Sequence, residues 1–257
     1  MARILITGSS DGLGQMAARL LVEQGHRVVL HARNEARGTH ALAQVPGAET
    51  VLCADLSSIA ETKALAGRIN ALGDFDAIIH NAAVGYQEPR RLATVDGLPH
   101  VFAINALAPY ILTALVNRPE RLVYVSSRLH CCGDPSLKDL TWKKRPWNGT
   151  QAYSDSKLHN VLLALAVARR WPDVLSNSLE PGWVPTKMGG PDAPDDLDLA
   201  PRTQAWLAAG IEPETQVTGG YFYHQRPATA MKAAQDFKVQ ERFLSACAEL
   251  SGVSLPQ

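Results

Sequence analysis

The sequence lacks an excess of charge of either sign. In a chain of 257 residues, 25 lysines and arginines balance 25 aspartates and glutamates. Proteins that hold nucleic acid or an anionic membrane surface by electrostatics carry a basic excess, and this chain has none. We therefore expect it to bind neither nucleic acid nor a membrane.

Long apolar runs are also missing. The longest, Val161 to Ala168, has eight residues, against about 20 for a membrane-spanning helix. The N-terminal run, Ile4 to Ile6, is too short for the core of a secretory signal peptide. These absences predict a soluble, cytoplasmic protein.

Cysteine is scarce. The four cysteines, at positions 53, 131, 132 and 247, fit neither a disulfide framework nor the spacing of a metal site. The adjacent Cys131 and Cys132 are poorly placed to bridge each other. We expect reduced thiols, in keeping with the cytoplasm, and no metal.

Short apolar runs alternate with segments of helical periodicity along the whole chain. Such alternation predicts an α/β protein in which a parallel sheet has helices on both faces, and no linker divides it into two domains. The expected strands are 4–6, 27–31, 50–54, 75–79, 121–125, 174–179 and 219–223, and the main helices are 13–22, 34–44, 59–72, 98–116, 153–169, 202–209 and 235–250.

A glycine-rich turn follows the first strand. Gly8, Gly12 and Gly14 would let the backbone turn tightly and approach a pyrophosphate at the N-terminus of the next helix. Free amide groups and the helix dipole favour negative charge there. The alternative is a glycine-rich turn that binds nothing.

The end of the second strand carries information on the nucleotide. An acid there would bond the ribose 2'-hydroxyl of NAD, and an arginine would accept the 2'-phosphate of NADP. The residues at this distance from the glycines are Ala32 and Arg33, without Asp or Glu. This favours NADP(H) over NAD(H), the alternative being a merely solvated arginine.

Tyr153 and Lys157 stand four residues apart at the start of a predicted helix, and so share one of its faces. An ammonium beside a phenol favours the phenolate, so Lys157 is expected to lower the pKa of Tyr153 from about 10. Tyrosine could then act as a proton donor or acceptor. The alternative is a surface pair without function.

These motifs occur in an order that resembles the short-chain dehydrogenase/reductase family. Thr-Gly-x-x-x-Gly-x-Gly from Thr7 comes first, then Ser126-Ser127, the Tyr153 and Lys157 pair, and Pro181-Gly182. Ser-Ser-x-x-His and Tyr-x-x-x-Lys-Leu-x-Asn are similar to the retinol-dehydrogenase-like and carbonyl-reductase-like branch. The resemblance implies a Rossmann-type doubly wound sheet of about seven strands in the order 3-2-1-4-5-6-7.

The resemblance also implies roles for individual residues. The catalytic set would be Asn105, Ser127, Tyr153 and Lys157, with Lys157 holding the nicotinamide ribose as well. Besides Tyr153 and Lys157, the residues implied to bind the cofactor are Gly8, Ser10, Gly12, Leu13, Gly14, Arg33, Asn34, Asp55, Leu56, Asn81, Ala82, Ala83, Pro181, Gly182, Val184 and Thr186.

Four other features carry separate expectations. Asp55 could instead cap the helix near 59–72, and His80 is expected to be packed rather than to carry protons. The segment 128–150 holds two tryptophans and is expected to form an ordered flap. A loop over 187–215 is expected to set substrate choice.

The expected function is that of an NADP(H)-dependent oxidoreductase, in which hydride passes between the nicotinamide and a carbonyl or alcohol. Tyr153 would be the general acid/base and Ser127 would bond the substrate oxygen. The substrate is expected to be apolar or aromatic. Two alternatives stay open, an NADPH-dependent reductase of carbon-carbon double bonds and a non-catalytic NADP-binding regulator, and the chain could be a monomer or a homodimer.

Overall fold

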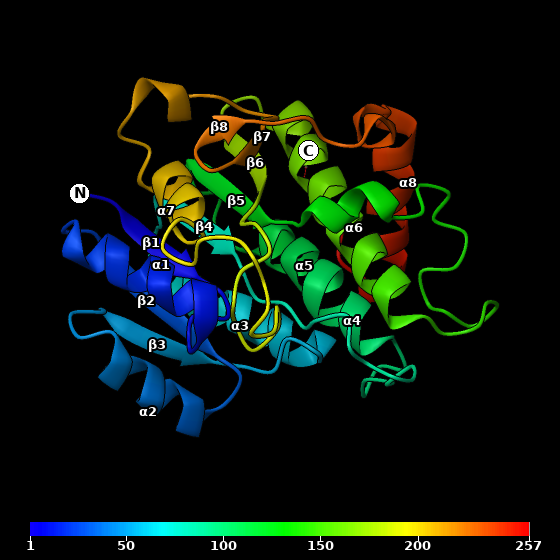
Figure 1. The fold of residues 1–257 in the computed structure, drawn as a ribbon, viewed down its shortest axis with the longest axis horizontal. Helices are drawn as coiled ribbons and strands as arrows, with labels where there is room; N and C mark the ends of the chain where they lie inside the picture. Colours follow the sequence, from blue (N-terminus) through cyan, green and yellow to red (C-terminus); the bar gives the residue numbers. More distant parts are fainter. Residues whose placement is uncertain (257) are drawn as a thin grey trace.

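The computed structural model describes residues 1–256. Its strands form one sheet in the spatial order β3-β2-β1-β4-β5-β6-β7-β8 (Figure 1). The first seven run parallel in the predicted order, and β8 adds an antiparallel strand at the edge that was not predicted. The strands are β1 Arg3–Ile6, β2 Arg27–Ala32, β3 Thr50–Cys53, β4 Ala77–His80, β5 Arg121–Val125, β6 Leu175–Glu180, β7 Tyr221–Tyr223 and β8 Arg226–Pro227.

Helices cover both faces of the sheet, and each face has its own apolar core. One core joins the sheet to α1, α2 and α7, and the other joins it to α3, α5, α6 and α8. The longer helices are α1 Gly12–Glu23, α2 Glu35–Gln44, α3 Ile59–Ala71, α5 Ala108–Leu115, α6 Gly149–Arg170, α7 Arg202–Ala209 and α8 Phe237–Ser251. The predicted doubly wound, single-domain α/β fold is confirmed.

The helix expected over 98–116 is not continuous. It consists of α4, His100–Phe102, a π-helical segment, Ala103–Leu107, and then α5. Pro109 lies just after this segment and has no backbone N–H to donate to the preceding turn. A π segment of this kind is frequent at functional sites, and here it contains Asn105.

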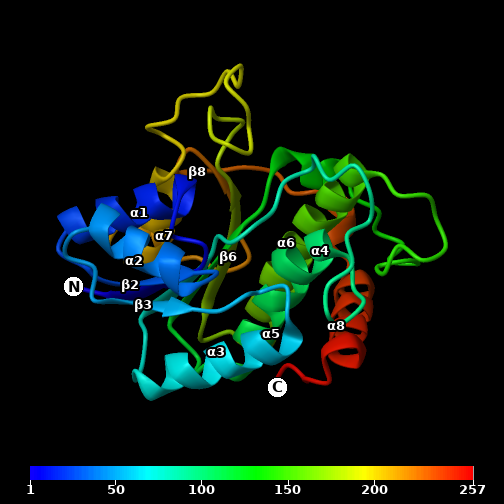
Figure 2. The ribbon, with the colours of Figure 1, turned by 90° about the horizontal axis from the view of Figure 1, so that it is seen from below.

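Helix α8 packs on the outer side of α6, away from the sheet (Figure 2). The ring of His159 on α6 stacks on Phe243 of α8, with 4.8 Å between ring centroids. The Tyr110 hydroxyl on α5 donates to the carbonyl of Val253 just after α8. No helix within residues 1–256 is long and apolar enough to cross a membrane.

The segment 128–150, which was predicted to form an ordered flap, packs against the rest of the chain through Trp142 and Arg145. It opens with the 3-10 helix η2, Arg128–Cys132, and then runs as a loop beside α6 and α8, at the right edge of Figure 1. Trp142 is only 6% exposed, and the guanidinium of Arg145 lies over its ring. Arg145 also forms an ion pair with Asp155, which ties the flap to α6.

Candidate active site

A cavity of about 530 Å³ lies at the carboxyl ends of the central strands, where open parallel sheets bind ligands. It brings together residues from the glycine turn, the ends of the strands, α6 and the loop after β6. Of the predicted site residues, those that line it are Gly8, Ser10, Gly12, Leu13, Gly14, Arg33, Asp55, Leu56, Asn81, Ala82, Ala83, Tyr153, Lys157, Pro181 and Thr186.

The glycine turn has no room for side chains at two of its glycines. A Cβ on Gly8, whose φ is +65°, would lie 2.7 Å from the Cα of Ala82. A Cβ on Gly14 would lie 2.3 Å from Nδ2 of Asn81. That amide donates to the carbonyls of Thr7 and Gly8, at 3.0 and 3.1 Å. Asn81 therefore fastens the turn to the end of β4, and the bare backbone suits close approach of a nucleotide pyrophosphate.

His31 also holds the glycine turn in place, and this role was not predicted from the sequence. The backbone N–H of Gly8 donates to its Nδ1 at 3.0 Å, so Nε2 carries the ring proton and donates to the carbonyl of Ala54 at 3.1 Å. Burial lowers the pKa of this imidazole to about 4, which keeps it neutral. The only sequence signal was a polar residue inside an apolar strand.

One end of the cavity is basic. Arg33 and Arg37 both line it, and Nε of Arg37 donates to the hydroxyl of Ser10 at 3.2 Å. Arg33 makes no hydrogen bond or ion pair with any other residue in 1–256. Two guanidinium groups beside a hydroxyl suit a phosphate group. Arg37 was not predicted, because its approach depends on where α2 begins.

Asn34, which was also predicted to bind the cofactor, does not line this cavity. Its side chain accepts the backbone N–H of Arg37 at 3.1 Å and so caps the N-terminus of α2. It acts on the site only by placing Arg37. The cap of α3 is Ser58 rather than Asp55, so the alternative structural role of Asp55 is not found.

Tyr153 and Lys157 lie on the buried face of α6, at 7% and 2% exposure. The ammonium Nζ is 5.4 Å from the centre of the Tyr153 ring and donates to the carbonyl of Val125 at 2.9 Å. Burial raises the pKa of Tyr153 to about 12 and lowers that of Lys157 to about 7. The expected lowering of the tyrosine pKa by lysine is therefore wrong for these residues alone, because loss of solvent dominates and the group that opposes it is Ser127 rather than Lys157.

Ser127 follows β5 and faces the same tyrosine. A hydrogen bond with the Ser127 side chain opposes the rise in the Tyr153 pKa that burial causes. The Ser127 hydroxyl also accepts the backbone N–H of Leu129 at 3.2 Å, which begins η2. The neighbouring Ser126 donates to the carbonyl of Lys157 at 2.8 Å. The two serines thus join the end of β5 to α6 at the level of the tyrosine and lysine.

Asn105 lies fully buried in the π segment. Its amide accepts from the N–H of Val84 at 2.8 Å and donates to the Val84 carbonyl and the Ser156 hydroxyl, both at 3.0 Å. It makes no hydrogen bond with Lys157 among the described residues. Its structural effect is to fix the chain after β4 against α6.

The loop after β6 meets the cavity through Pro181 and Thr186. Gly182 and Val184, which were predicted to bind the cofactor, do not line it. A Cβ on Gly182, with φ of +90°, would press against Asp195, and Val184 is 4% exposed. The same loop also brings Lys187 and Met188, which were not predicted, to the cavity wall.

The side of Tyr153 that faces the flap is apolar and aromatic. The ring of Tyr86 meets that of Tyr153 edge-on, with 5.7 Å between centroids. Trp142 belongs to the same apolar cluster, and Trp147 and Met188 pack against it. The predicted flap and the loop after β6 therefore meet beside the tyrosine.

His80 is packed, as expected. Its ring stacks on Tyr124 with 4.8 Å between centroids, and its Nε2 lies 3.2 Å from the hydroxyl of Thr113. Burial lowers its pKa to about 3. It holds β4, β5 and α5 together and does not line the cavity.

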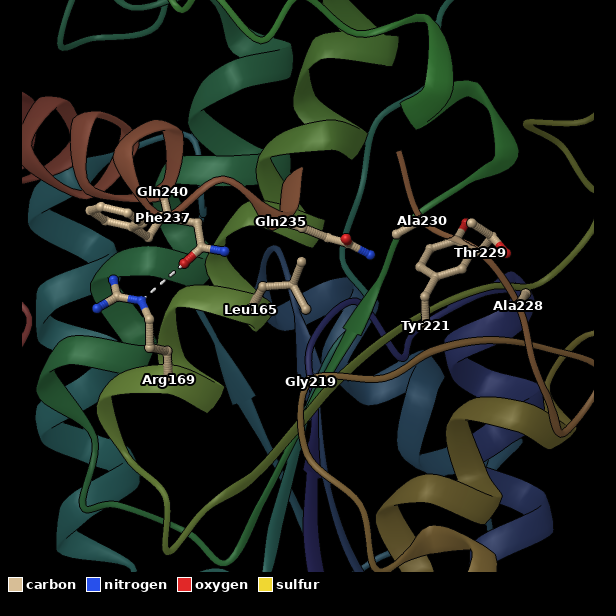
Figure 3. Close-up of a pocket in the computed structure, with 10 residues that line it drawn as sticks. All are labelled: Leu165, Arg169, Gly219, Tyr221, Ala228, Thr229, Ala230, Gln235, Phe237 and Gln240. Carbon is tan, nitrogen blue, oxygen red and sulfur yellow. Dashed lines mark hydrogen bonds between the residues drawn. The ribbon is translucent and has the colours of Figure 1, made fainter. Parts of the chain in front are cut away.

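A second cavity, of about 420 Å³, lies away from Tyr153, between α6, β7 and the start of α8 (Figure 3). Its polar residues are partly bonded to one another, as Nε of Arg169 donates to the side-chain oxygen of Gln240 at 3.2 Å. Tyr221 and Ala230 form its wall nearest to η2. No cluster of His, Cys, Asp and Glu that could hold a metal occurs within residues 1–256.

Known proteins resemble this chain over its whole length. The family model for short chain dehydrogenases matches residues 2–127. An uncharacterised oxidoreductase of Emericella nidulans is 48% identical over 260 residues, covering 100% of this chain and 99% of the relative. The short-chain dehydrogenase chry4 of Gibberella zeae is 45% identical, with the same shares covered.

More distant relatives extend this likeness. Retinol dehydrogenase 14 of Homo sapiens is 32% identical over 213 residues, covering 72% of this chain and 62% of that protein. A solved protein of Mycobacterium paratuberculosis superposes with a TM-score of 0.86 at 26% identity, covering 100% of this chain and 96% of that chain.

Proposed function

The chain belongs to the short-chain dehydrogenase/reductase family, in its retinol-dehydrogenase-like branch, and we propose that it interconverts a carbonyl compound and its alcohol with NADP(H). The observation that carries the proposal is the meeting of Tyr153, Lys157 and Ser127 beside a cavity that begins at a glycine turn. Proteins of this family are oxidoreductases that bind small molecules.

The residues present fit a dinucleotide. The glycine turn would receive the pyrophosphate, and Arg33 and Arg37 with Ser10 would receive a 2'-phosphate, which distinguishes NADP from NAD. Lys157 would hold the nicotinamide ribose, and Thr186 would meet the carboxamide. When bound, the nicotinamide supplies the hydride for carbonyl reduction.

The protein groups then handle the proton. Tyr153 gives its phenolic proton to the carbonyl oxygen while the carbonyl carbon gains hydride, so the product is the neutral alcohol. The Ser127 hydroxyl donates to the same oxygen and orients it. Because burial raises the pKa of Tyr153 to about 12, the phenol keeps its proton near neutral pH, which suits a proton donor.

The substrate end is proposed to take apolar or aromatic carbonyl compounds. Tyr86, Trp142 and Met188 form the apolar surroundings of Tyr153 on the flap side. Burying apolar surface against them would supply about 25 cal/mol for each Å² removed from water.

The test is NADPH oxidation over a panel of aromatic and aliphatic aldehydes, ketones, quinones and enones, with the parent and Tyr153→Phe. Loss of about 100- to 10,000-fold in turnover by the variant, at unchanged NADPH affinity, is expected for a general acid. Turnover of enones alone would replace the proposal by carbon-carbon double-bond reduction. Tight NADPH binding with no turnover would replace it by a nucleotide-binding regulator.

A further inference from the structure

His130 joins three segments of the chain behind the serine that faces Tyr153. It lies on η2, is 1% exposed, and has polar partners on both ring nitrogens. Nδ1 is 2.7 Å from the carbonyl oxygen of Ser127, and Nε2 is 3.0 Å from the backbone nitrogen of Met231. The imidazole therefore spans the end of β5 and the segment that leads to α8.

These partners decide the tautomer. The backbone N–H of Met231 can only donate, so Nε2 must be unprotonated and accept. A neutral imidazole then carries its single proton on Nδ1, from which it donates to the Ser127 carbonyl. Burial lowers the pKa of His130, which agrees with a neutral ring. The doubly protonated ring would lose the bond to Met231.

Besides Cys131, whose Sγ lies 3.5 Å from Nε2, Tyr221 also contacts the ring. Its hydroxyl lies 3.2 Å from Nδ1 of His130, and the two rings are tilted together with 4.7 Å between centroids. Tyr221 and Ala230 form one wall of the second cavity (Figure 3), and Met231 follows Ala230 in the chain. His130 thus connects that wall with the end of β5.

We propose that His130 is a positioning residue that fixes the peptide of Ser127, so that its hydroxyl faces Tyr153 and the substrate oxygen. The inference rests on the proposed function for its kinetic effect. Ser127 is the last extended residue before η2, and its carbonyl also accepts the backbone N–H of His130 at 2.9 Å. With the imidazole gone, this carbonyl keeps the 2.9 Å bond from the backbone N–H and loses the 2.7 Å bond from the ring.

Three variants separate the two ring bonds. His130→Asn offers an amide N–H near the place of Nδ1, His130→Gln offers an oxygen near the place of Nε2, and His130→Leu offers neither. Turnover of benzaldehyde with NADPH is expected to fall about 10- to 100-fold in the Leu and Gln variants, as for other small displacements of a reacting group. The Asn variant is expected to keep most of the parental turnover. In all three variants, NADPH affinity is expected to change less than about twofold, because His130 does not line the cofactor cavity.

His159→Leu is the matched control. This histidine is similarly buried, at 2% exposure, but stacks on Phe243 of α8 and forms no hydrogen bond within residues 1–256. His159→Leu is expected to change the melting temperature and to have the same turnover number as the parent. Equal turnover losses in His130→Leu and His159→Leu, or full turnover in His130→Leu, would overturn the positioning role.

The tautomer is a readout that needs no turnover. In spectra of nitrogen-15-labelled protein, His130 is expected as the neutral form with its proton on Nδ1 throughout the neutral pH range. A proton on Nε2, or a charged ring, would contradict the inference whatever the substrate is. Failure of the parent to reduce any carbonyl would instead contradict the proposed function and leave the tautomer result to stand.

Discussion

Lys187 in the loop after β6 forms an ion pair with Asp11 in the glycine turn, although 176 positions separate them in the chain. Both line the cavity that holds Tyr153. The hydrogen bond from Lys187 lowers the pKa of Asp11, so that the carboxylate is charged at neutral pH. Asp11 also lies 3.8 Å from the guanidinium of Arg37. A negative charge therefore competes for an arginine that we assign to the cofactor phosphate.

Asp11→Asn is expected to raise the affinity for NADPH about 3- to 10-fold and to leave that for NADH nearly unchanged, because it frees Arg37. Asparagine keeps the cap of α1, since its oxygen can still accept the N–H of Gly12. Fluorescence titration with each nucleotide measures the ratio. The control Lys187→Met keeps the Asp11 carboxylate and removes its lysine partner, so Asp11 should hold Arg37 more strongly. The ratio of NADPH affinity to NADH affinity should then fall. An unchanged ratio in both variants would remove Asp11 from the nucleotide site.

Arg33→Ala and Arg37→Ala are each expected to weaken NADPH binding about tenfold or more, with NADH affinity altered less than about twofold. With NADPH, each variant loses a charge-assisted bond to the 2'-phosphate. With NADH, no such bond exists to be lost. Arg19→Ala is the matched control, because this arginine on α1 bonds the carbonyl of Gln44 and does not line the cavity. Equal losses for both nucleotides would argue against a 2'-phosphate site.

The difference between these two arginines shows what the sequence could predict. Arg33 follows a strand directly, so its place at the edge of the sheet follows from strand periodicity. Arg37 reaches the same cavity only because α2 begins at Glu35 with Asn34 as its cap. Helix ends are uncertain by a residue or two in a sequence, and each residue turns a side chain by about 100°.

Loop paths and short elements escaped prediction for a similar reason. β5 and α7 were predicted to the residue, because an apolar run or a helical repeat marks them. β8 has two residues, one of them Pro227, and so has no period to detect. The pairing of Lys187 with Asp11 joins two segments without periodicity. The family resemblance supplied the order of the motifs but not these contacts.

Lys157→Met is expected to abolish turnover and yet to raise the melting temperature by several degrees. Burial lowers the pKa of Lys157 from 10.5 to about 7, so the charged form destabilises the folded state. Below about pH 7 the lysine is charged in both states and the folded state bears the whole penalty. Above it the folded state releases its proton first, so the penalty shrinks as pH rises toward 10.5.

The gain from Lys157→Met should therefore be larger at about pH 6 than at about pH 9, of the order of 2 kcal/mol at the lower pH, since Nζ retains its bond to Val125 in the parent. Thermal unfolding at both pH values measures it. A variant less stable than the parent at the lower pH would show that the lysine is a net stabiliser.

Asp139 holds the turn of the flap. Its carboxylate accepts the backbone N–H groups of Lys143, Lys144 and Arg145, at 3.0, 2.8 and 3.1 Å. Burial raises its pKa, but these bonds outweigh that effect and leave it lowered. The turn places Trp142, at a φ of +52°, in the apolar cluster beside Tyr153. Asp139→Ala is therefore expected to raise KM for an aromatic carbonyl compound about 5- to 20-fold and to change the turnover number little.

Hydrogen exchange supplies the structural half of this test. The amides of Lys143, Lys144 and Arg145 should all exchange faster in Asp139→Ala. In Asp139→Asn, which keeps one accepting oxygen, those of Lys144 and Arg145 should stay near the parental rate, because these two share Oδ2. A depressed carboxyl pKa stabilises above the unfolded value of 3.8 and stops doing so as pH falls through the folded value. In the parent, the protection of these amides should thus be constant near neutral pH and decline below about pH 4. Faster exchange in Asp139→Ala without a change in KM would show that the flap does not contribute to substrate binding.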